Sequence, residues 1–321
     1  MALLPLVPVS DQLASAVRGG LTATPKSLPP WLLYDDAGSA LFDEITRLPE
    51  YYLTRTERGI FARHADAIVA QAAQGSRLRI AELGAGSAEK TQLLLAAAAR
   101  LQGRVHYEPV DVSLSALEAA CTRIHRELPA VTATPRLVDY TEACNFAPCP
   151  GERRLVLYIG SSIGNFSPAG SARILASVRA ALVPGDALLL GVDLVKPEPL
   201  LHAAYNDAAG VTAAFNRNLL IRLNRELGAD FNLQSFAHVA LWNPAESRIE
   251  MHLESLCDQS VDLPPLDLRI NFARGERIHT ENSYKYTLAR AGALLRAAGF
   301  AVESTWTDDQ SWFAEFIARA V

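Results

Sequence analysis

Between residues 78 and 195 the chain alternates short, continuously apolar runs with longer stretches rich in alanine and leucine. Continuously apolar strands that are separated by helices predict a parallel sheet that is covered on both faces. We therefore expect an α/β fold built on a doubly wound, mostly parallel sheet. The expected strands are 78–83, 105–110, 135–140, 154–160 and 187–195.

The segments on either side of this alternation add helices and a terminal hairpin. Apolar spacing predicts a helix over 39–48, and Thr54 and Glu57 have the spacing of a capping box that would begin a second helix ending near Gln74. A last helix is expected over 288–298. The two strand-like segments that follow it predict an antiparallel hairpin at the edge of the sheet.

One connection is far longer than a crossover requires. The 92 residues of 196–287 separate the fifth expected strand from the last helix, and they contain a helical stretch over 202–227 and alternating strands over 247–256 and 266–273. We interpret this segment as an inserted α+β subdomain that packs with the N-terminal region. The predicted domains are a core of 61–195 with 288–321, and a substrate-binding subdomain of 1–60 with 196–287.

Charge and composition exclude several classes of function. The chain has 30 Lys and Arg against 35 Asp and Glu, a net charge of −5, and no basic run, which argues against a nucleic-acid partner. No apolar stretch is long enough to cross a membrane, and the start MALLPLVPVSD lacks the features of a signal peptide. Four cysteines without CxxC spacing predict a cytoplasmic protein. The carboxylates and histidines show no metal-ligand grouping, so no metal is expected. A monomer is expected.

A glycine-containing turn closes the first expected strand. Gly84 and Gly86, in the sequence ELGAG, allow a tight turn and a close approach of the backbone to a ligand, although glycine also simply ends strands. The third glycine of a dinucleotide fingerprint is missing, which weakens an NAD or FAD assignment.

Acidic residues after the next strands favour an adenosine-containing ligand. Asp111 can accept hydrogen bonds from both ribose hydroxyls or can cap the helix that follows, and Asp139-Tyr140 either flanks an adenine or forms a turn. Lys90, near a helix N-terminus, either meets a carboxylate such as that of S-adenosylmethionine (SAM) or is solvated. Together these features are the pattern of a Rossmann-like class I SAM-dependent methyltransferase.

The loop LYIGSSIGNFSP ends the fourth expected strand at the edge where open α/β sheets bind ligands. Gly160 and Gly164 keep this loop close to a ligand. Asn165 offers two donors and an acceptor, although a loop asparagine is commonly a turn former.

Several segments in order resemble the histidine-specific Nα-methyltransferases, which make hercynine for ergothioneine biosynthesis. The resemblance spans nearly the whole chain, including the long insertion. The segments are TPKSLPP, LYDDAGSALFDEITRLPEYYLTRTE, ELGAGSAEKT, YEPVDVS, GSSIGNFSP, LLLGVDLVK, AYNDAAGVTAAFNRN and HTENSYKY.

This resemblance implies a role for each matching residue, with SAM as co-substrate and L-histidine as a small-molecule substrate. It implies that Tyr51 and Tyr34 lie near the reacting amine, and that Asn282 stands where the family has a small apolar residue. The SAM contacts would be Gly84, Gly86, Lys90, Asp111, Asp139 and Tyr140; the histidine contacts would be Tyr51, Gly160, Asn165, Tyr205, Met251, Glu281, Asn282 and Ser283.

The chemistry of imidazole fits the implied pair Glu281 and Ser283. A neutral imidazole has one N–H donor and one acceptor, so a carboxylate and a hydroxyl can satisfy both nitrogens. Without the resemblance, Glu281 would be interpreted as a surface charge and Ser283 as a turn residue. The rival hypotheses are methylation of another amino acid such as tryptophan, methylation of a protein residue, and a non-catalytic module that binds SAM.

Overall fold

The computed structural model describes residues 11–141 and 144–321, so the apolar start at residues 1–10 lies outside the described residues. The described residues form two compact units. The larger unit comprises Tyr52–Pro197 and Ser283–Val321. The smaller unit comprises the described residues through Tyr51 together with Glu198–Asn282.

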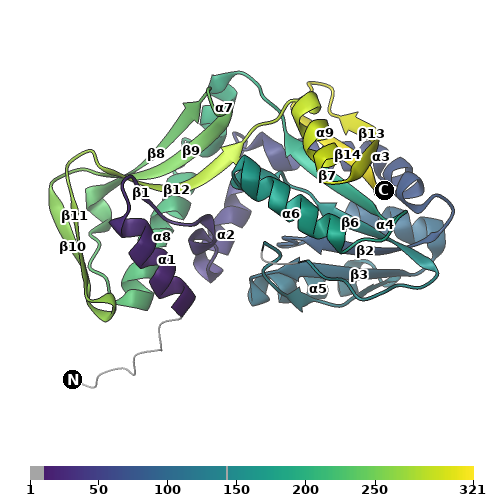
Figure 1. The fold of residues 1–321 in the computed structure, drawn as a ribbon, viewed down its shortest axis with the longest axis horizontal. Coiled ribbons are helices and arrows are strands. Elements are labelled where there is room, and N and C mark those ends of the chain that lie inside the picture. The colour runs from purple at the N-terminus through teal and green to yellow at the C-terminus, as the bar shows by residue number, and fades with distance from the viewer. Residues whose placement is uncertain (1–10, 142–143) are drawn as a thin grey trace. The chain divides into compact units, whose positions relative to one another are not determined.

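The larger unit is built on an eight-stranded sheet in the order β13-β14-β7-β6-β2-β3-β4, with β5 paired to β3 (Figure 1). Neighbouring strands from β7 to β4 are parallel, and β13 and β14 form an antiparallel hairpin that pairs with β7 at the edge. The expected doubly wound, mostly parallel sheet with a terminal hairpin is therefore confirmed. The strands are β2 Arg77–Leu83, β3 Val105–Asp111, β4 Val131–Ala133, β5 Arg136–Leu137, β6 Glu152–Tyr158, β7 Ala187–Asp193, β13 Phe300–Thr307 and β14 Phe313–Ala320.

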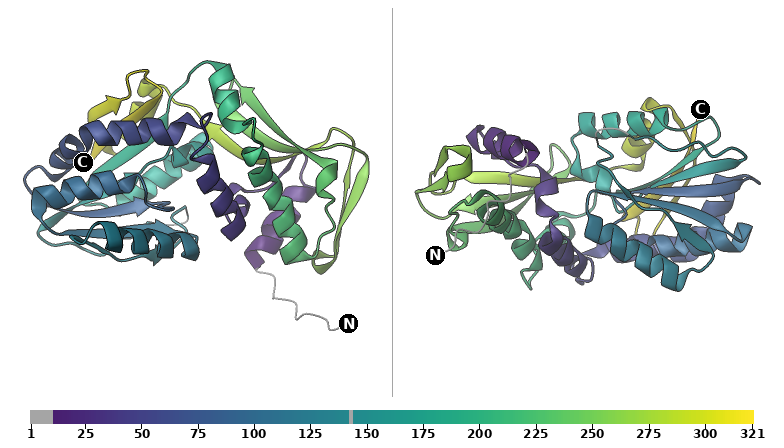
Figure 2. Two further views of the ribbon diagram at one scale, coloured as in Figure 1. Left: turned by 180° about the vertical axis from the view of Figure 1, so that it is seen from behind. Right: turned by 90° about the horizontal axis from the view of Figure 1, so that it is seen from below.

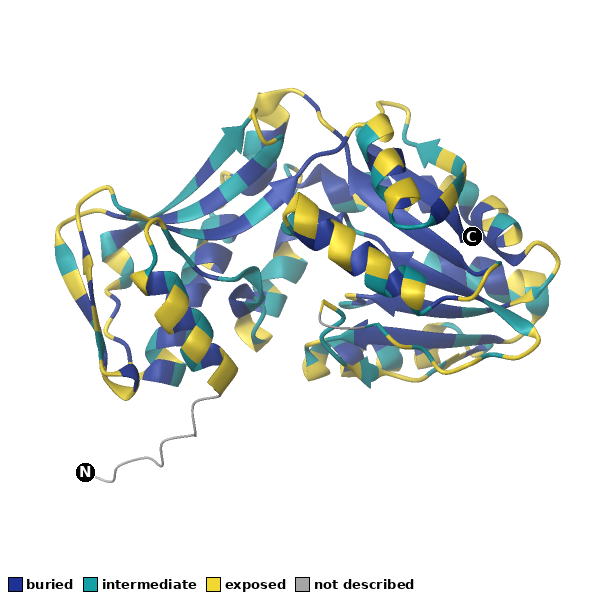
Figure 3. Cartoon of the chain, viewed as in Figure 1, coloured by how far each residue is buried: buried dark blue, intermediate teal, exposed yellow. Residues whose placement is uncertain are grey.

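Helices cover both faces of this sheet, as the view from below shows (Figure 2). One apolar core joins one face of the sheet to α3, α4 and α5, and a second joins the opposite face to α6 and α9. The strands are buried along most of their length, whereas the outer helix faces are exposed (Figure 3). The helices are α3 Tyr52–Ala73, α4 Thr91–Gln102, α5 Leu114–Glu127, η2 Ser162–Asn165, α6 Pro168–Ala180 and α9 Leu288–Ala297.

Two local predictions in the larger unit are wrong. The expected strand over 135–140 is reduced to β5, because Asp139 forms a turn with Thr141, and Pro135, which has no N–H to donate, separates β5 from the preceding β4. The capping box is also wrong, since α3 begins at Tyr52 and Thr54 lies inside the helix. Glu57 is wholly buried and contacts other elements instead.

The smaller unit contains a four-stranded sheet in the order β1-β12-β9-β8 and a separate hairpin of β10 and β11. Its long helix α8 supplies buried leucines to the core and packs on α2. The last two residues of β12 belong to the larger unit. The elements are α1 Asp11–Thr22, β1 Lys26–Ser27, η1 Pro30–Leu33, α2 Asp36–Ile45, α7 Glu198–Tyr205, α8 Val211–Leu227, η3 Leu233–Ser235, β8 Phe236–Asn243, β9 Arg248–Ser255, β10 Gln259–Leu263, η4 Pro264–Leu266, β11 Leu268–Phe272 and β12 Arg277–Tyr284.

The helix boundaries of the smaller unit differ from those expected. The helical stretch over 202–227 is two helices, because Asp207 accepts hydrogen bonds from the first N–H groups of α8 and Gly210 has a φ of 76°. Helix α2 begins before residue 39, since Asp35 caps it by accepting from the Gly38 N–H at 2.8 Å. Position 38, in the first turn of α2, requires glycine. A Cβ on Gly38 would lie 1.7 Å from the Leu33 carbonyl oxygen.

The prediction that no segment crosses a membrane, and the state of the cysteines, can be compared with the part of the chain that the structure describes. Within it, no helix combines the length and the apolar character that a membrane crossing demands. The four cysteines, all among the described residues, are free thiols.

Candidate functional site

The larger unit has a topological switch point between β2 and β6. These two strands are adjacent and parallel, and the sheet continues through β3 on one side and through β7 on the other. Open α/β sheets bind ligands beyond the carboxyl ends of the strands at such a point. The loop with Gly84 and Gly86 leaves β2 at this edge, and the loop with Gly160 and Asn165 leaves β6 at the same edge.

The turn after β2 is held by the end of β3. The N–H groups of Gly84 and Ala85 donate to the Val110 carbonyl oxygen at 2.8 and 3.2 Å, and the Gly86 N–H donates to Asp111 Oδ2 at 3.0 Å. Both glycines have positive φ, 68° and 50°, and a Cβ on Gly86 would meet open space. The structure thus brings the glycine turn and Asp111 together, with room for a ligand to approach the backbone.

The pair Asp139-Tyr140 contributes one residue to this edge. A Cβ on Gly84 would lie 3.5 Å from the Tyr140 hydroxyl oxygen, so the Tyr140 ring stands beside the glycine turn. Tyr140 also packs edge-on against Tyr158, with ring centroids 5.7 Å apart. Asp139 accepts hydrogen bonds from the N–H and O–H of Thr141 at 2.9 and 2.6 Å, which is the turn-forming role considered as its alternative.

Lys90 has a protein carboxylate as its partner. It is the N-cap residue of α4, and its Nζ forms an ion pair with Glu57 Oε2. The other oxygen of Glu57 accepts the Gly160 N–H at 2.5 Å. Glu57 therefore ties the helix after β2 to the loop after β6. Sequence reasoning missed this role; the available signal was that Ile60 and Phe61, three and four positions later, place Glu57 on the apolar face of the helix.

A second buried carboxyl lies beside Glu57. A Cβ on Gly191, in the middle of β7, would lie 2.7 Å from Glu57 Oε1 and 2.8 Å from Glu315 Oε1, so only glycine fits. Burial and the negative charge of Glu57 raise the pKa of Glu315 well above its ordinary value. Burial beside the charge of Glu57 thus favours the protonated form of Glu315.

Glu82, at the end of β2, is a third buried acid below this edge. Its two oxygens accept hydrogen bonds from the hydroxyls of Thr91 and Tyr107. Burial raises the pKa of Glu82 to about 7, because removal from water disfavours the charged form more than these donors favour it.

In the smaller unit, aromatic rings form a continuous cluster. Tyr34 packs edge-on against Phe42 and Phe215 at centroid distances of 5.7 and 5.4 Å, and Tyr51 packs against Phe42 and Tyr205, each at 6.2 Å. Such packing holds each ring in one orientation and leaves the hydroxyls at the ends of rigid side chains. The structure thus brings Tyr34, Tyr51 and Tyr205 together within the smaller unit.

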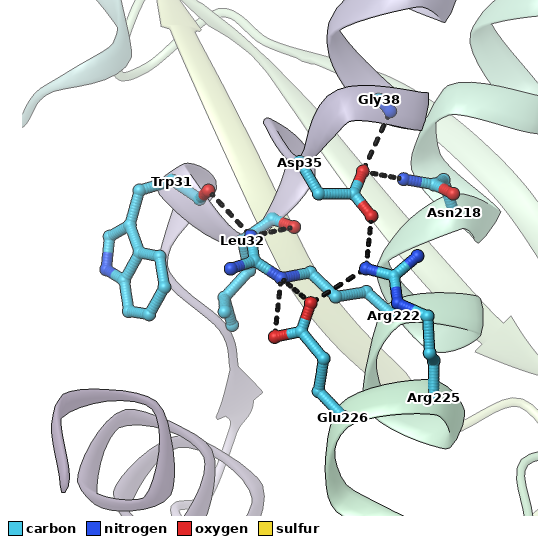
Figure 4. Close-up of polar contacts among 8 residues, drawn as sticks. All are labelled: Trp31, Leu32, Asp35, Gly38, Asn218, Arg222, Arg225 and Glu226. Atoms are coloured by element: carbon cyan, nitrogen blue, oxygen red, sulfur yellow. Dashed lines mark hydrogen bonds and ion pairs between the residues drawn. The ribbon is translucent and has the colours of Figure 1, made fainter. Parts of the chain in front are cut away.

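The turn that carries Tyr34 is bound to α8 by polar contacts (Figure 4). Asp35 accepts from Asn218 at 2.6 Å and pairs with Arg225 at 2.7 Å. Arg222 donates to the main-chain oxygens of Trp31 and Leu32 at 3.4 and 3.2 Å. These contacts lie on both sides of Tyr34 in the sequence and fix its position on the unit.

Glu281 is a buried carboxylate of the smaller unit. Its residue is 6 % exposed, and the Tyr34 hydroxyl donates to its Oε1 at 3.5 Å. Met251, on the neighbouring strand β9, is buried as well. The Asn282 side-chain oxygen is 3.0 Å from His279 Nε2, so its amide is engaged with a protein group.

The predicted residues divide between the units. The larger unit contains the six residues assigned to SAM together with Gly160, Asn165 and Ser283, and the smaller unit contains Tyr34, Tyr51, Tyr205, Met251, Glu281 and Asn282. In residues 11–141 and 144–321 there is no group of three or more His, Cys, Asp and Glu side chains arranged to hold a metal ion.

Comparison with known proteins places these observations in a family. The model of the histidine-specific, SAM-dependent methyltransferases matches residues 13–320. The chain is 46% identical to a histidine N-alpha-methyltransferase of Mycolicibacterium smegmatis, over 96% of this chain and 95% of that protein. It is 46% identical to a histidine N-alpha-methyltransferase of Mycobacterium tuberculosis, over 94% of this chain and 93% of that protein. It is 29% identical to ergothioneine biosynthesis protein 1 of Neurospora crassa, over 92% of this chain and 33% of that protein.

Proposed function

The chain belongs to the family of histidine-specific, SAM-dependent methyltransferases, and we propose that it methylates the α-amino nitrogen of L-histidine. Three successive transfers would produce hercynine, the betaine from which ergothioneine is made. The observation that carries the proposal is the 46% identity to a histidine N-alpha-methyltransferase along 96% of the chain. The buried Glu281 supports it, because a carboxylate in that position suits an imidazole N–H.

We propose that the larger unit binds SAM, which supplies a methyl group on a positively charged sulfur. The residues present fit this ligand, since the turn at Gly84 and Gly86 leaves space beside its backbone. Asp111 would accept from the ribose hydroxyls, Lys90 would pair with the carboxylate, and Tyr140 would lie against the adenine.

The side chains assigned to histidine act on its two ends. Tyr205 and Asn165 bind the α-carboxylate by donating hydrogen bonds, and Glu281 and Ser283 bind the two nitrogens of a neutral imidazole. Side chains without both a ring donor and a ring acceptor would leave these polar groups unpaired, which is the basis of the expected selectivity. Met251 provides an apolar wall, and Gly160 lets the backbone approach the substrate.

The tyrosines act on the reacting amine. In-line methyl transfer needs a neutral amine lone pair about 3 Å from the methyl carbon, so positioning and loss of a proton are the tasks of the protein. Tyr51 and Tyr34 orient the amine and accept or relay its proton, directly or through water. Unchanged rates at every methylation step in Tyr51→Phe and Tyr34→Phe would contradict these roles.

The test is a reaction of the purified protein with SAM and L-histidine, followed over time by tandem mass spectrometry. Mass gains of one, two and three methyl groups, all on the α-amino nitrogen, are the expected result. Methyl groups on a ring nitrogen, or no product from folded protein that binds SAM, would overturn the proposed function.

The setting of the reaction is proposed on composition alone. The net charge of −5 supports a small-molecule enzyme without a nucleic-acid partner, and the cysteines without CxxC spacing support a cytoplasmic location; a monomer with no membrane partner is proposed with them. Light scattering on the purified protein tests the monomer directly, and a dimer mass would contradict it.

A further inference from the structure

Asn216, on helix α8, is a buried polar residue that contacts three strands of the smaller unit. It is 0 % exposed. Its Nδ2 lies 3.0 Å from His238 Nδ1 on β8 and 3.0 Å from the His252 carbonyl oxygen on β9. Its Oδ1 accepts a hydrogen bond from the Thr280 hydroxyl on β12 at 2.7 Å. One side chain therefore connects α8 to β8, β9 and β12 of the four-stranded sheet.

The partners of Asn216 fix the direction of these hydrogen bonds. The His252 carbonyl oxygen can only accept, so the amide nitrogen of Asn216 faces it and donates. The second N–H of that nitrogen donates to His238 Nδ1, which is therefore the unprotonated nitrogen of the ring. His238 carries its proton on Nε2 and donates it to the Tyr205 carbonyl oxygen at 2.9 Å. Burial lowers the pKa of His238, which favours this neutral ring.

The network ends beside two residues that are assigned to histidine. On one side, His238 holds the main chain of Tyr205 at the end of α7. On the other side, Thr280 directly precedes Glu281 on β12. Both ends belong to the smaller unit. Asn216 thus joins the segment that carries Tyr205 to the segment that carries Glu281.

A polar network in this place is suited to fix a geometry. The residues around Asn216 on α8 are apolar and buried, among them Phe215, Leu219, Leu220 and Leu223. A buried amide among such residues is costly unless its hydrogen bonds are made, and here its donors and its acceptor all have partners. A matched network of this kind holds its members in one arrangement, which apolar packing alone does not require.

We propose that Asn216 is a positioning residue that sets the spacing between Tyr205 and Glu281 and thereby selects the length of the substrate side chain. The inference rests on the proposed histidine methylation and deepens it. In that function Tyr205 binds the α-carboxylate and Glu281 binds the ring. A fixed spacing between them suits one number of bonds between the α-carbon and the ring, so an amino acid with one more methylene would strain the network.

Asn224 provides a matched control on the same helix. Its side chain donates to the Phe231 carbonyl oxygen at 2.8 Å and accepts from the Phe231 N–H at 2.9 Å. Asn216→Ala and Asn224→Ala each remove an amide from α8 together with its hydrogen bonds. Only Asn216→Ala breaks the connection between Tyr205 and Glu281.

The experiment compares the Kd of histidine with the Kd of homohistidine, whose side chain has one more methylene before the ring. Both are measured by calorimetry with S-adenosylhomocysteine present, because this product has no methyl group to transfer. The wild type is first tested for methylation of histidine, since absence of methylation would refute the proposed function whatever Asn216 does. An active wild type should bind homohistidine at least about tenfold more weakly than histidine.

The two variants should then differ in selectivity. Asn216→Ala should raise the Kd of histidine about tenfold, because Tyr205 and Glu281 are no longer held at one spacing. The Kd of homohistidine should rise less than about threefold, so the preference for histidine falls. Asn224→Ala should keep both Kd values within about twofold of wild type, and the Kd of SAM should stay within about twofold in both variants.

Four results would overturn the inference in a protein that methylates histidine. They are equal binding of the two amino acids by the wild type, an equal rise of both Kd values in Asn216→Ala, an unchanged Kd of histidine in that variant, and the same loss of preference in Asn224→Ala. An equal rise would mean that Asn216 only stabilises the fold.

A second variant covers the case in which Asn216→Ala does not fold. Thr280→Val keeps the branched shape of the side chain and removes the hydroxyl that donates to Asn216. It should also lower the preference for histidine, and an unchanged preference would then overturn the inference. Circular dichroism and thermal melting of every variant separate loss of folding from loss of selectivity.

Discussion

Each unit contains acids whose pKa values are shifted, and the largest shifts run in opposite directions in the two units. In the larger unit, burial raises the pKa of Glu82 to about 7 and, with the charge of Glu57, raises the pKa of Glu315 well above its ordinary value. In the smaller unit, burial alone would raise the pKa of Glu250, but hydrogen bonds from Asn243 and Arg248 lower it to about 2. The pKa of Asp35 is lowered in the same way by Arg225, Gly38 and Asn218, against the effect of burial.

This difference separates structural carboxylates from functional ones. The carboxylates of Asp35 and Glu250 are matched by donors within the smaller unit and stabilise its fold. The larger unit instead keeps poorly matched acids below the edge where SAM binding is proposed, and such groups persist where function needs them. Glu281 is also buried in the smaller unit, and it is the carboxylate that we assign to the imidazole ring of the substrate.

The largest expected effect tests this assignment of Glu281. Glu281→Gln should lower kcat/KM for histidine by about 100-fold, because an amide can present an N–H where the ring needs an acceptor. The SAM Kd should stay within twofold. Glu276→Gln, which removes a carboxylate paired with Lys26 in the same unit, is the matched control and should retain kcat/KM within about threefold. Wild-type kcat/KM in Glu281→Gln would refute the assignment.

A smaller effect distinguishes the two buried carboxyls beside Gly191. Glu57→Gln should raise the KM for SAM about tenfold, since it removes the charge that holds Lys90 and weakens the bond to the Gly160 N–H. Glu315→Gln should leave the KM for SAM within about threefold of the wild-type value, because an amide resembles the protonated acid in size and charge. Steady-state kinetics with varied SAM measures both. The reverse order of effects would show that Glu57, not Glu315, holds the proton.

Tyr34→Phe tests whether the aromatic cluster positions a hydroxyl or only fills space. The ring contacts with Phe42 and Phe215 remain, so the melting temperature should not change. Loss of the 3.5 Å bond to Glu281 should lower kcat/KM for histidine about fivefold, as expected for a long hydrogen bond. A fall in melting temperature with unchanged kcat/KM would assign Tyr34 to packing.

The smallest expected effect is on the pH dependence of the melting temperature, which is compared for one acid from each unit. The pKa of Glu82 is about 7 in the folded protein against an ordinary 4.5, so the folded form retains the proton between these values. The stability from the protonated acid is fully present below pH 4.5 and is lost as pH rises through 7. The melting temperature of Glu82→Gln minus that of wild type should therefore increase by about 2–4 °C from pH 5 to pH 8.

Glu250→Gln is the contrasting variant for this measurement. With a folded-state pKa of about 2 and an ordinary value of 4.5, its contribution is present above pH 4.5 and is lost only as pH falls toward 2. Its melting-temperature difference from wild type should therefore be constant from pH 5 to pH 8. A slope in Glu250→Gln, or none in Glu82→Gln, would contradict the comparison.

Most of the fold could be predicted because its signals are local. The apolar runs at 78–83, 105–110, 154–160 and 187–195 correspond to β2, β3, β6 and β7, and the terminal hairpin is β13 and β14. The failures are also local in origin. The turn formed by Asp139 shortens an expected strand, and Asp207 with Gly210 divides an expected helix.

The site was only partly predictable because its supporting charges come from distant segments. The glycine turn and Asp111 are separated by one helix, so their meeting follows from the βαβ pattern. Glu57 and Gly160 are 103 positions apart, and no short-range pattern pairs Asp193, the last residue of β7, with Lys285, which follows β12. The sequence shows Thr54 and Glu57 as a capping box, whereas tertiary packing uses Glu57 to hold Lys90.

The most direct test of the central claim is a competition among substrates. Folded protein is incubated with SAM and an equimolar mixture of the twenty amino acids, and mass spectrometry records which of them gain methyl groups. The account predicts one, two and then three methyl groups on histidine and none on the other nineteen. Methylation of tryptophan or another amino acid in preference to histidine would contradict the assignment of Glu281 and Ser283 as the selective pair.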